Sequence, residues 1–248
     1  MNIESTTYQY YSHWLGMDIC DKTKGFYLVY NQDRDNMPKG YSCPMDIFAY
    51  LCADLLIISY GNRAKEKIEK IIHAIKGIAD IDCIKSLFAD IFSTNVHHGI
   101  KYIYKNKKES QIEAEILKAN HIELFLDFFK SNNQNLKDYL WVKEYYLDMV
   151  SKHYCHGIIL DEKLVSATDA PDMPYMQELV QEMGINTLAE HRGKGFARAV
   201  CISFINELLS KGVCPLWSTG NNNVASDRLA YSIGFEKLAD ILTLTISG

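Results

Sequence analysis

The sequence contains few of the residues that define fibrous, disordered or disulfide-stabilised chains. It has only 5 Pro and 14 Gly in 248 residues, which excludes collagen-like and low-complexity proteins. Its 7 Cys are odd in number and include no Cys-x-x-Cys pair. Disulfide frameworks and zinc ribbons use even, clustered cysteines. We therefore expect reduced thiols in a cytoplasmic protein.

Excess positive charge and long apolar runs are also missing. The 26 Lys and Arg are outnumbered by 31 Asp and Glu, so the net charge is −5, which argues against a nucleic-acid partner. The most apolar segment, Ile47–Tyr60, contains Asp54 and is shorter than the roughly 20 residues of a membrane span. Met1–Tyr11 lacks the basic and apolar parts of a signal peptide. We expect a soluble cytoplasmic chain that binds neither nucleic acid nor membrane.

The composition that remains is that of a folded protein, with 48% hydrophobic and 23% charged residues. At about 150 residues per domain, the length fits one large or two small domains. The polar run Lys105–Glu109, in which four of five residues are charged, is the predicted linker. We expect an N-terminal lobe of mixed helices and strands over residues 1–108 and a second domain over residues 109–248.

Hydrophobic periodicity predicts the elements of both parts. Expected in the first part are a strand at Gly25–Tyr30, a buried helix at Pro44–Ser59, a helix at Ala64–Ile75 with Ile68, Ile71, Ile72 and Ile75 on one face, and a strand at Gly99–Tyr104. Strands expected in the second part are Glu113–Leu117, His156–Leu160, Lys163–Ala167, Glu178–Leu188, Pro215–Ser218 and Ile241–Ile246. Helices expected there are His121–Lys130, Trp141–Lys152, Gly195–Ser210 and Val224–Ile233. This order predicts an α/β or α+β fold with one sheet covered by helices.

The segment Ile185–Ala197 has the pattern of an anion site. An extended run leads into a loop with Gly193 and Gly195 and then into an apolar helix. The free N–H groups in the first turn of a helix and the helix dipole attract negative charge. Glycines let a phosphate approach the backbone closely. The segment therefore predicts a binding site for a phosphate-bearing ligand.

The charge around this loop also favours a polyanionic ligand. Arg192, Lys194 and Arg198 are basic, and no acidic residue occurs over residues 191–206. The loop alone fits a surface turn before a core helix equally well, since short glycine motifs often match by chance. Arg198 stands where the dinucleotide-binding fingerprint requires a third glycine, and the Gly-Lys-Ser/Thr of a phosphate-binding P-loop is absent.

Two motifs together resemble the GNAT superfamily of acyl-CoA-dependent N-acyltransferases. The loop Arg192-Gly-Lys-Gly195-Phe-Ala197 matches in part the family pattern Gln/Arg-x-x-Gly-x-Gly/Ala. Further along, the segment from Asn223 to Gly234-Phe235 is similar to the family's Asn-led helix that ends in Gly-Phe. The sequence Gly-Ile-Asn-Thr before the loop and Cys214–Trp217 resemble one branch of bacterial GNAT acetyltransferases. The resemblance covers about residues 111–248.

This resemblance implies a mixed, mainly antiparallel splayed sheet flanked by helices, plus a smaller N-terminal α/β lobe. Acetyl-CoA would lie in the gap of the sheet as cosubstrate, with no metal. Backbone amides would hold its pyrophosphate, those of Arg192, Gly193, Lys194, Gly195, Phe196 and Ala197. The strand edge at Ile185, Asn186 and Thr187 would pair with the pantetheine arm, and Asn223 would hydrogen-bond that arm near the thioester.

Acetyl transfer to an amine needs a group that accepts the amine proton. Glu182, three residues before Ile185, is the candidate base, and an ordinary carboxylate at a strand end is the alternative. The family's general acid, a tyrosine four residues before the glycine of Gly-Phe, is replaced here by Ala230. Tyr231 is one residue away, about 100° around a helix. Ser226, one turn earlier, is a substitute acid that could instead cap the helix.

The function these motifs favour is transfer of an acetyl group from acetyl-CoA to a primary amine, by direct attack in a ternary complex. The acceptor would be a small-molecule amine or a peptide, and the N-terminal lobe would close over it. A non-catalytic CoA-binding or regulatory module on the same fold is the alternative. A third interpretation, transfer from a charged tRNA, is disfavoured by the acidic chain. The tyrosines at 8, 10, 11, 145 and 146 fit an acceptor pocket or packing between the two parts equally well, and a homodimer is left open.

Overall fold

A computed structural model of the chain describes residues 1–75 and 80–246. Its helices are α1 (Ile3–Leu15), α2 (Lys65–Ala74), α3 (Ile81–Phe92), α4 (Ile122–Asn132), α5 (Leu140–Ser151), α6 (Phe196–Ser210) and α7 (Val224–Ser232). Its strands are β1 (Lys24–Tyr30), β2 (Ile47–Cys52), β3 (Asp54–Tyr60), β4 (His97–Tyr104), β5 (Glu115–Ile116), β6 (His156–Leu160), β7 (Lys163–Asp169), β8 (Val180–Glu182), β9 (Gly184–Thr187), β10 (Cys214–Gly220) and β11 (Phe235–Leu244). The last two residues of the predicted second domain lie outside the described residues.

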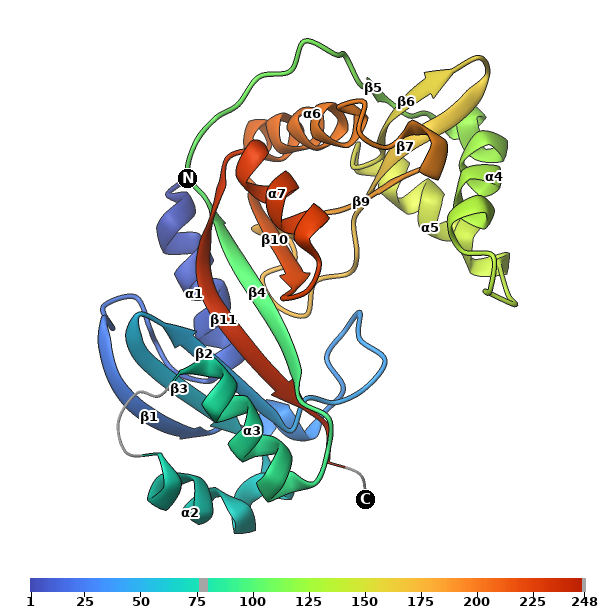
Figure 1. Cartoon of the computed structure of the whole chain (residues 1–248). Coiled ribbons are helices and arrows are strands. Elements are labelled where there is room, and N and C mark those ends of the chain that lie inside the picture. The colour runs from blue at the N-terminus through green and yellow to red at the C-terminus, as the bar shows by residue number, and fades with distance from the viewer. Residues whose placement is uncertain (76–79, 247–248) are drawn as a thin grey trace.

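The strands form two sheets (Figure 1). One has the order β1-β3-β2-β11-β4-β10-β8, and the other has the order β5-β6-β7-β9. The pairs β1–β3 and β8–β10 are parallel, whereas the other pairs are antiparallel. The mixed, mainly antiparallel α/β fold flanked by helices is therefore confirmed, but its strands form two sheets and not the single sheet predicted. In the described part of the chain, no helix combines the length and apolar character needed to cross a bilayer.

The larger sheet extends across the predicted boundary at residues 108 and 109. Strand β4, from before the boundary, lies between β10 and β11, which come from after it. Strand β11 also pairs with β2, with Asp240 opposite Leu51 and Leu244 opposite Ile47. The polar run Lys105–Glu109 does lie in the loop after β4. Residues 1–108 thus share a sheet with the second part, and their folding as a separate lobe is still a prediction.

The predicted helix at Pro44–Ser59 is wrong, because this segment is the hairpin of β2 and β3. Ala53, with φ of 47°, makes the turn between them. Tyr50 and Ile57 are paired and pack against α1, whereas Ile47 and Ile58 point to the other face and pack with α2 and α3. A strand that is buried on both faces is apolar without a period of two. Periodicity therefore cannot distinguish it from a buried helix.

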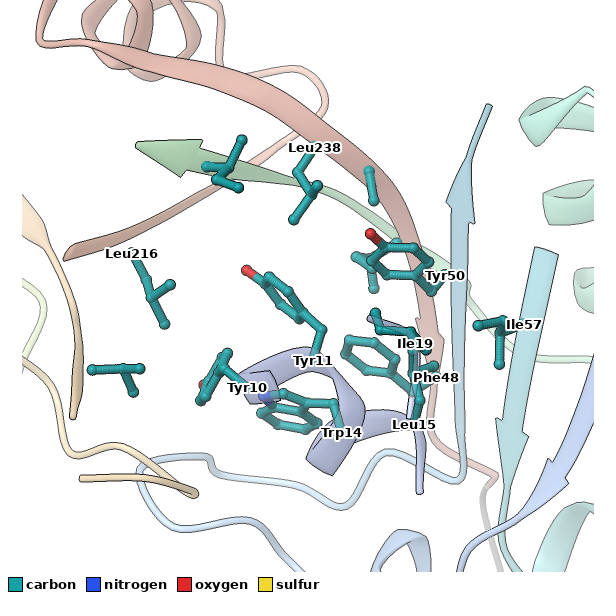
Figure 2. Close-up of a cluster of buried hydrophobic side chains, with 14 of the residues drawn as sticks. Tyr10, Tyr11, Trp14, Leu15, Ile19, Phe48, Tyr50, Ile57, Leu216 and Leu238 are labelled. Atoms are coloured by element: carbon teal, nitrogen blue, oxygen red, sulfur yellow. The ribbon is translucent and has the colours of Figure 1, made fainter. Parts of the chain in front are cut away.

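Helix α1, which the sequence patterns do not predict, covers one face of the larger sheet. Asn2 caps its first turn by accepting from the Ser5 N–H at 3.1 Å, and Gly16, with φ of 71°, ends it. Its Tyr10, Tyr11 and Trp14 pack on residues of β2, β10 and β11, as Figure 2 shows. These tyrosines are buried, so packing between the two parts of the chain accounts for them.

The structure confirms most of the other predicted elements. Helix α2 buries Ile68 and Ile71 but leaves Ile72 45% exposed, so the isoleucine face is narrower than predicted. Helices α4, α5, α6 and α7 lie within a few residues of their predicted bounds, as do β6 and β7. The predicted strand at Glu178–Leu188 is two strands, β8 and β9, which belong to different sheets.

A buried histidine, His156 on β6, joins the smaller sheet to α6. Its Nδ1 lies 2.9 Å from the Ser203 hydroxyl, and its Nε2 lies 3.0 Å from the His153 carbonyl oxygen. Burial lowers the pKa of His156 from 6.5 to about 4. The folded state therefore favours the neutral ring, while the unfolded chain takes up a proton below about pH 6.5.

We expect this histidine to make the protein less stable as the pH falls from 6.5 towards 4. Between pH 7 and pH 5 its contribution to the free energy of unfolding should fall by about 2 kcal/mol. His156→Gln, which cannot titrate, should lose less stability over that range than the parent protein. Urea denaturation of both proteins at pH 5, 6 and 7 measures the difference. An equal loss of stability in the two proteins contradicts the prediction.

Candidate active site

The chain leaves one sheet and enters the other between β8 and β9. Strand β8 pairs with β10 as far as Glu182 and Leu216, and the Met183 N–H donates to the Leu216 carbonyl at 3.1 Å. From Gly184 onward, β9 pairs with β7 instead, as the edge strand of the smaller sheet. Strands β9 and β10 therefore diverge from this point, which leaves the outer edge of β9 open.

A cleft of about 760 Å³ fills the space between the diverging strands. Its walls are residues 184–187 of β9, residues 217–220 of β10, the start of α6 and the start of α7. The predicted binding residues that line it are Ile185, Asn186, Thr187, Arg192, Gly193, Gly195, Phe196, Ala197 and Asn223. Lys194 is exposed and lies outside the lining. The structure thus brings segments from across the sequence to one cleft.

The glycine loop presents backbone amides at one end of this cleft. Gly193 and Gly195 have φ of 75° and 84°, the left-handed region that glycine adopts without strain. Gly195 is the N-cap of α6, and no side chain caps this helix. Ala199 donates to the Gly195 carbonyl at 3.1 Å, so the N–H groups in the turn before it have no carbonyl within the helix to bond. These N–H groups lie at the positive end of the helix dipole.

Two arginines hold the ends of this loop. The Arg192 Nε donates to the Thr187 carbonyl at 3.1 Å, at the end of β9. The Arg198 Nε donates to the Ser232 carbonyl at 3.3 Å, at the end of α7. Both arginines line the cleft. Their charges therefore add to the positive potential at the N-terminus of α6.

Helix α7 contributes Asn223 and Ser226. The Asn223 Oδ1 accepts from the Ser226 N–H at 3.1 Å, so Asn223 is the N-cap of α7. Ser226 is therefore not the cap, and it lines the cleft one turn into the helix. Because only the oxygen of the Asn223 amide is engaged in the cap, its NH₂ group is left for another acceptor.

Glu182 lies where the two strands begin to diverge. It accepts a hydrogen bond from the Ser218 hydroxyl, and Ser218 lines the cleft. The carboxylate faces the α1 side, because Val180 and Leu216, two residues before Glu182 and Ser218 on the same strands, pack with α1. The carboxylate is thus held beside the cleft on the face opposite α6 and α7.

Tyr231 is placed outside the lining of this cleft. It is 46% exposed, and its ring packs edge-on against Tyr102 with 6.0 Å between the ring centroids. Ala230, at the position where the family carries its tyrosine, is fully buried. The turn of α7 therefore points position 230 into the core and position 231 to solvent.

Three further polar groups belong to residues of the cleft that the sequence motifs do not assign to the site. Trp217 Nε1, Thr219 Oγ1 and His191 Nδ1 are buried, and they have no hydrogen-bond partner among the described residues. All three residues line the cleft. These atoms are shielded from solvent, so a ligand in the cleft reaches them only if neighbouring side chains move. Thr219 lies outside every motif of the sequence, because β10 reaches the cleft only through its pairing with β4 and β8.

The geometry defines a cleft between diverging strands of an α/β fold, lined by the N-terminus of α6 and by two arginines. The sequence model of the family described as GNAT acetyltransferase matches residues 65–241. Since this span exceeds half of the chain, the chain belongs to the GNAT acetyltransferase family. The match begins in α2, well before residue 111, where the sequence resemblance begins. The family therefore includes β4, which completes the sheet around the cleft.

Solved structures are similar in fold. An acetyltransferase from the GNAT family of Colwellia psychrerythraea is 18% identical, with a TM-score of 0.51 over 64% of this chain and 62% of that chain. A GCN5-related N-acetyltransferase-like protein from Streptococcus suis is 18% identical, with a TM-score of 0.40 over 64% and 66%. A protein from Salmonella typhimurium, solved with its cofactor acetyl-CoA, is 14% identical, with a TM-score of 0.43 over 54% and 93%.

The chain spans less than two thirds of the first two of these structures, 62% and 66% of their lengths. At 18% identity the Colwellia structure supports the fold alone. No curated protein matches the chain by sequence. In residues 1–75 and 80–246, no three His, Cys, Asp or Glu side chains gather as a metal site requires.

Proposed function

We propose that this chain transfers an acetyl group from acetyl-CoA to a primary amine, by direct attack in a ternary complex. The observation that carries the proposal is the cleft where β9 and β10 diverge. It combines the uncapped N-terminus of α6, the open edge of β9 and the lining arginines Arg192 and Arg198. A ligand with phosphates at one end and amides along an extended arm fits these groups.

The residues of the cleft suit the parts of acetyl-CoA. The amides of residues 192–197 would hold the pyrophosphate, since helix N-termini bind phosphate. The edge of β9 at Ile185, Asn186 and Thr187 would pair with the amides of the pantetheine arm, as an added strand does. The free NH₂ of Asn223 would donate to the same arm. When bound, acetyl-CoA supplies an activated acyl group on a thioester.

Side chains of the protein would accept and donate the protons of the reaction. The amine nitrogen forms a bond to the acetyl carbon, the carbon–sulfur bond breaks, and the amine proton passes to Glu182 directly or through water. The Ser218 hydroxyl holds the Glu182 carboxylate in place. The Ser226 hydroxyl, which lines the cleft, would donate a proton to the leaving thiolate, or the thiolate leaves unprotonated. Tyr231 has no role in this proposal, because it lies outside the cleft lining.

A non-catalytic coenzyme-binding module is the second candidate. The observation that favours it is the buried Ala230 at the position of the family's acid. In that case the cleft would bind acetyl-CoA and release no thiol in the presence of amines.

Calorimetric titration with acetyl-CoA, followed by a thiol-release assay over a panel of primary amines, tests the proposal. We expect binding and amine-dependent release of CoA. Binding without release at any amine supports the module instead. Absence of acetyl-CoA binding overturns both candidates.

A further inference from the structure

We propose that a second cleft beside the first is the acceptor site, and that it selects an amine with an apolar, preferably aromatic, body and no carboxylate. This inference rests on the proposed acetyl transfer. The second cleft has a volume of about 870 Å³. It lies between α4, α5 and β7, and Lys39 and Gly40 from the loop after β1 close it on another side.

The two clefts meet at β9. Asn186 lines both of them. Gly184 lines the first cleft and is paired with Asp169, which lines the second. A Cβ added to Gly184 would stand 2.8 Å from the Asp169 Cβ and 3.0 Å from its Oδ2. The Asp169 carboxylate therefore lies directly against the β9 backbone at Gly184. Gly184 follows Glu182 by two residues in the chain.

Asp169 is held in a fixed orientation. The Tyr145 hydroxyl donates a hydrogen bond to the Asp169 Oδ1. The same hydroxyl accepts a hydrogen bond from the Ala170 N–H at 3.1 Å. Burial, together with the charge of Asp169, raises the pKa of Tyr145, so the phenol remains a donor. Because Oδ1 is engaged by Tyr145, Oδ2 on the Gly184 side is left to receive an ammonium group.

The charges in the second cleft favour a cationic ligand. Its lining carboxylates are those of Glu144, Asp148, Asp169 and Asp172. The two lining lysines are paired: Lys39 lies 3.4 Å from the Asp172 carboxylate, and Lys152 lies 2.6 Å from that of Asp148. Glu144 and Asp169 therefore give the cleft an excess of negative charge. A carboxylate on the acceptor would be repelled there.

An aromatic wall faces these carboxylates. Trp141 is 46% exposed, yet it packs edge-on against Phe129, with 5.6 Å between centroids, and at a tilt against Tyr145, with 5.7 Å between centroids. All three residues line the cleft. Burying a large, rigid and solvent-exposed aromatic ring against a ligand is favourable. Aromatic or other apolar groups on the ligand bury it best. The acceptor would therefore carry its amine towards Asp169 and its apolar body towards Trp141. The bound ammonium would release one proton to water, and its neutral nitrogen would then attack the thioester.

Three amines test this site by calorimetry on the full chain without acetyl-CoA. Phenethylamine has an aromatic body and no carboxylate, phenylalanine adds a carboxylate, and ethylamine lacks the ring. We expect phenethylamine to bind at least about tenfold more tightly than either of the others. Equal binding of the three amines, or no binding of phenethylamine, overturns the inference.

Two variants locate the binding. Asp169→Asn keeps an oxygen for the Tyr145 hydroxyl but removes the charge, and should weaken phenethylamine binding roughly 10- to 100-fold. Trp141→Ala should weaken it about tenfold. Matched controls are Asp127→Asn on α4 and Leu147→Ala on α5, exposed residues outside both clefts, which should bind phenethylamine like the parent protein.

The assay separates the two proposals. Acetyl-CoA titration without amine tests the first cleft, and amine titration without acetyl-CoA tests the second. If Asp169→Asn binds phenethylamine as tightly as Asp127→Asn does, the second cleft is not the acceptor site, whatever the first cleft binds. If amines bind as expected but no thiol is released, the proposed transfer fails while the amine site stands.

Discussion

Gly195→Asp is expected to weaken acetyl-CoA binding about 100-fold, which corresponds to about 2.7 kcal/mol. The new carboxylate would stand among the amides that we propose for the pyrophosphate. Gly195 has φ of 84°, a left-handed conformation that Asp adopts more readily than most residues. A Cβ there meets Ile112 Cδ1 at 3.4 Å, an ordinary contact. Two like charges about 4 Å apart repel by about 4 kcal/mol at an effective dielectric constant of 20, enough for the expected loss.

Gly212→Asp is the matched control, because Gly212 follows the same helix at its other end. It also has a left-handed φ, of 72°, and open space around its Cβ position. Both variants therefore strain the backbone in a similar way, but only one adds charge to the cleft. Calorimetric titration of the two with acetyl-CoA compares them directly. Similar dissociation constants would show that the loop of Gly193 and Gly195 does not hold the pyrophosphate.

Glu182→Gln is expected to lower kcat about 10²- to 10⁴-fold, the range for loss of a general base. The glutamine oxygen can still accept from the Ser218 hydroxyl, so the local structure should persist. Since the carboxylate lies on the α1 side of the divergence, acetyl-CoA binding should change little. Thiol release under saturating amine and acetyl-CoA gives kcat, and titration gives the dissociation constant.

Glu178→Gln is the control for this substitution, since Glu178 is exposed and lies just before β8. A parent-like kcat in Glu182→Gln would make Glu182 an ordinary carboxylate at a strand end. The variant also distinguishes the two carboxylates near the divergence. Glu182→Gln should act on kcat, whereas Asp169→Asn should act mainly on the KM for the amine.

Local patterns predicted α2, the four helices α4 to α7 and the glycine loop, but neither α1 nor α3. In α6, Phe204, Ile205 and Leu208 are buried as the apolar stripe requires, and Gly193 and Gly195 have the left-handed φ values that favour glycine. These features depend on a few neighbouring residues, so the sequence carries them directly. The helix predicted at Pro44–Ser59 was wrong for the opposite reason. The β2–β3 hairpin found there is apolar on both faces because helices from other parts of the chain cover both.

The candidate site was only partly predictable. The residues of β9, the loop and α7 came from motifs along the chain, and most of them line the first cleft. Ser218, Trp217 and Thr219 were missed, because β10 brings them to the cleft by pairing with strands far away in sequence. Asp169 was missed for the same reason, as its place beside Gly184 follows from the register of β7 and β9.

The sequence alone thus determines the parts that short-range physics controls: the left-handed glycines, the free amides at the start of α6 and the basic residues around the loop. The tertiary structure determines the divergence of β8 and β9, the sharing of one sheet by residues from both sides of position 108, and the meeting of the two clefts at β9. Strand pairing sets all three, and pairing between distant segments depends on the register of backbone hydrogen bonds and on which faces are buried. Neither is written in any single stretch of the chain.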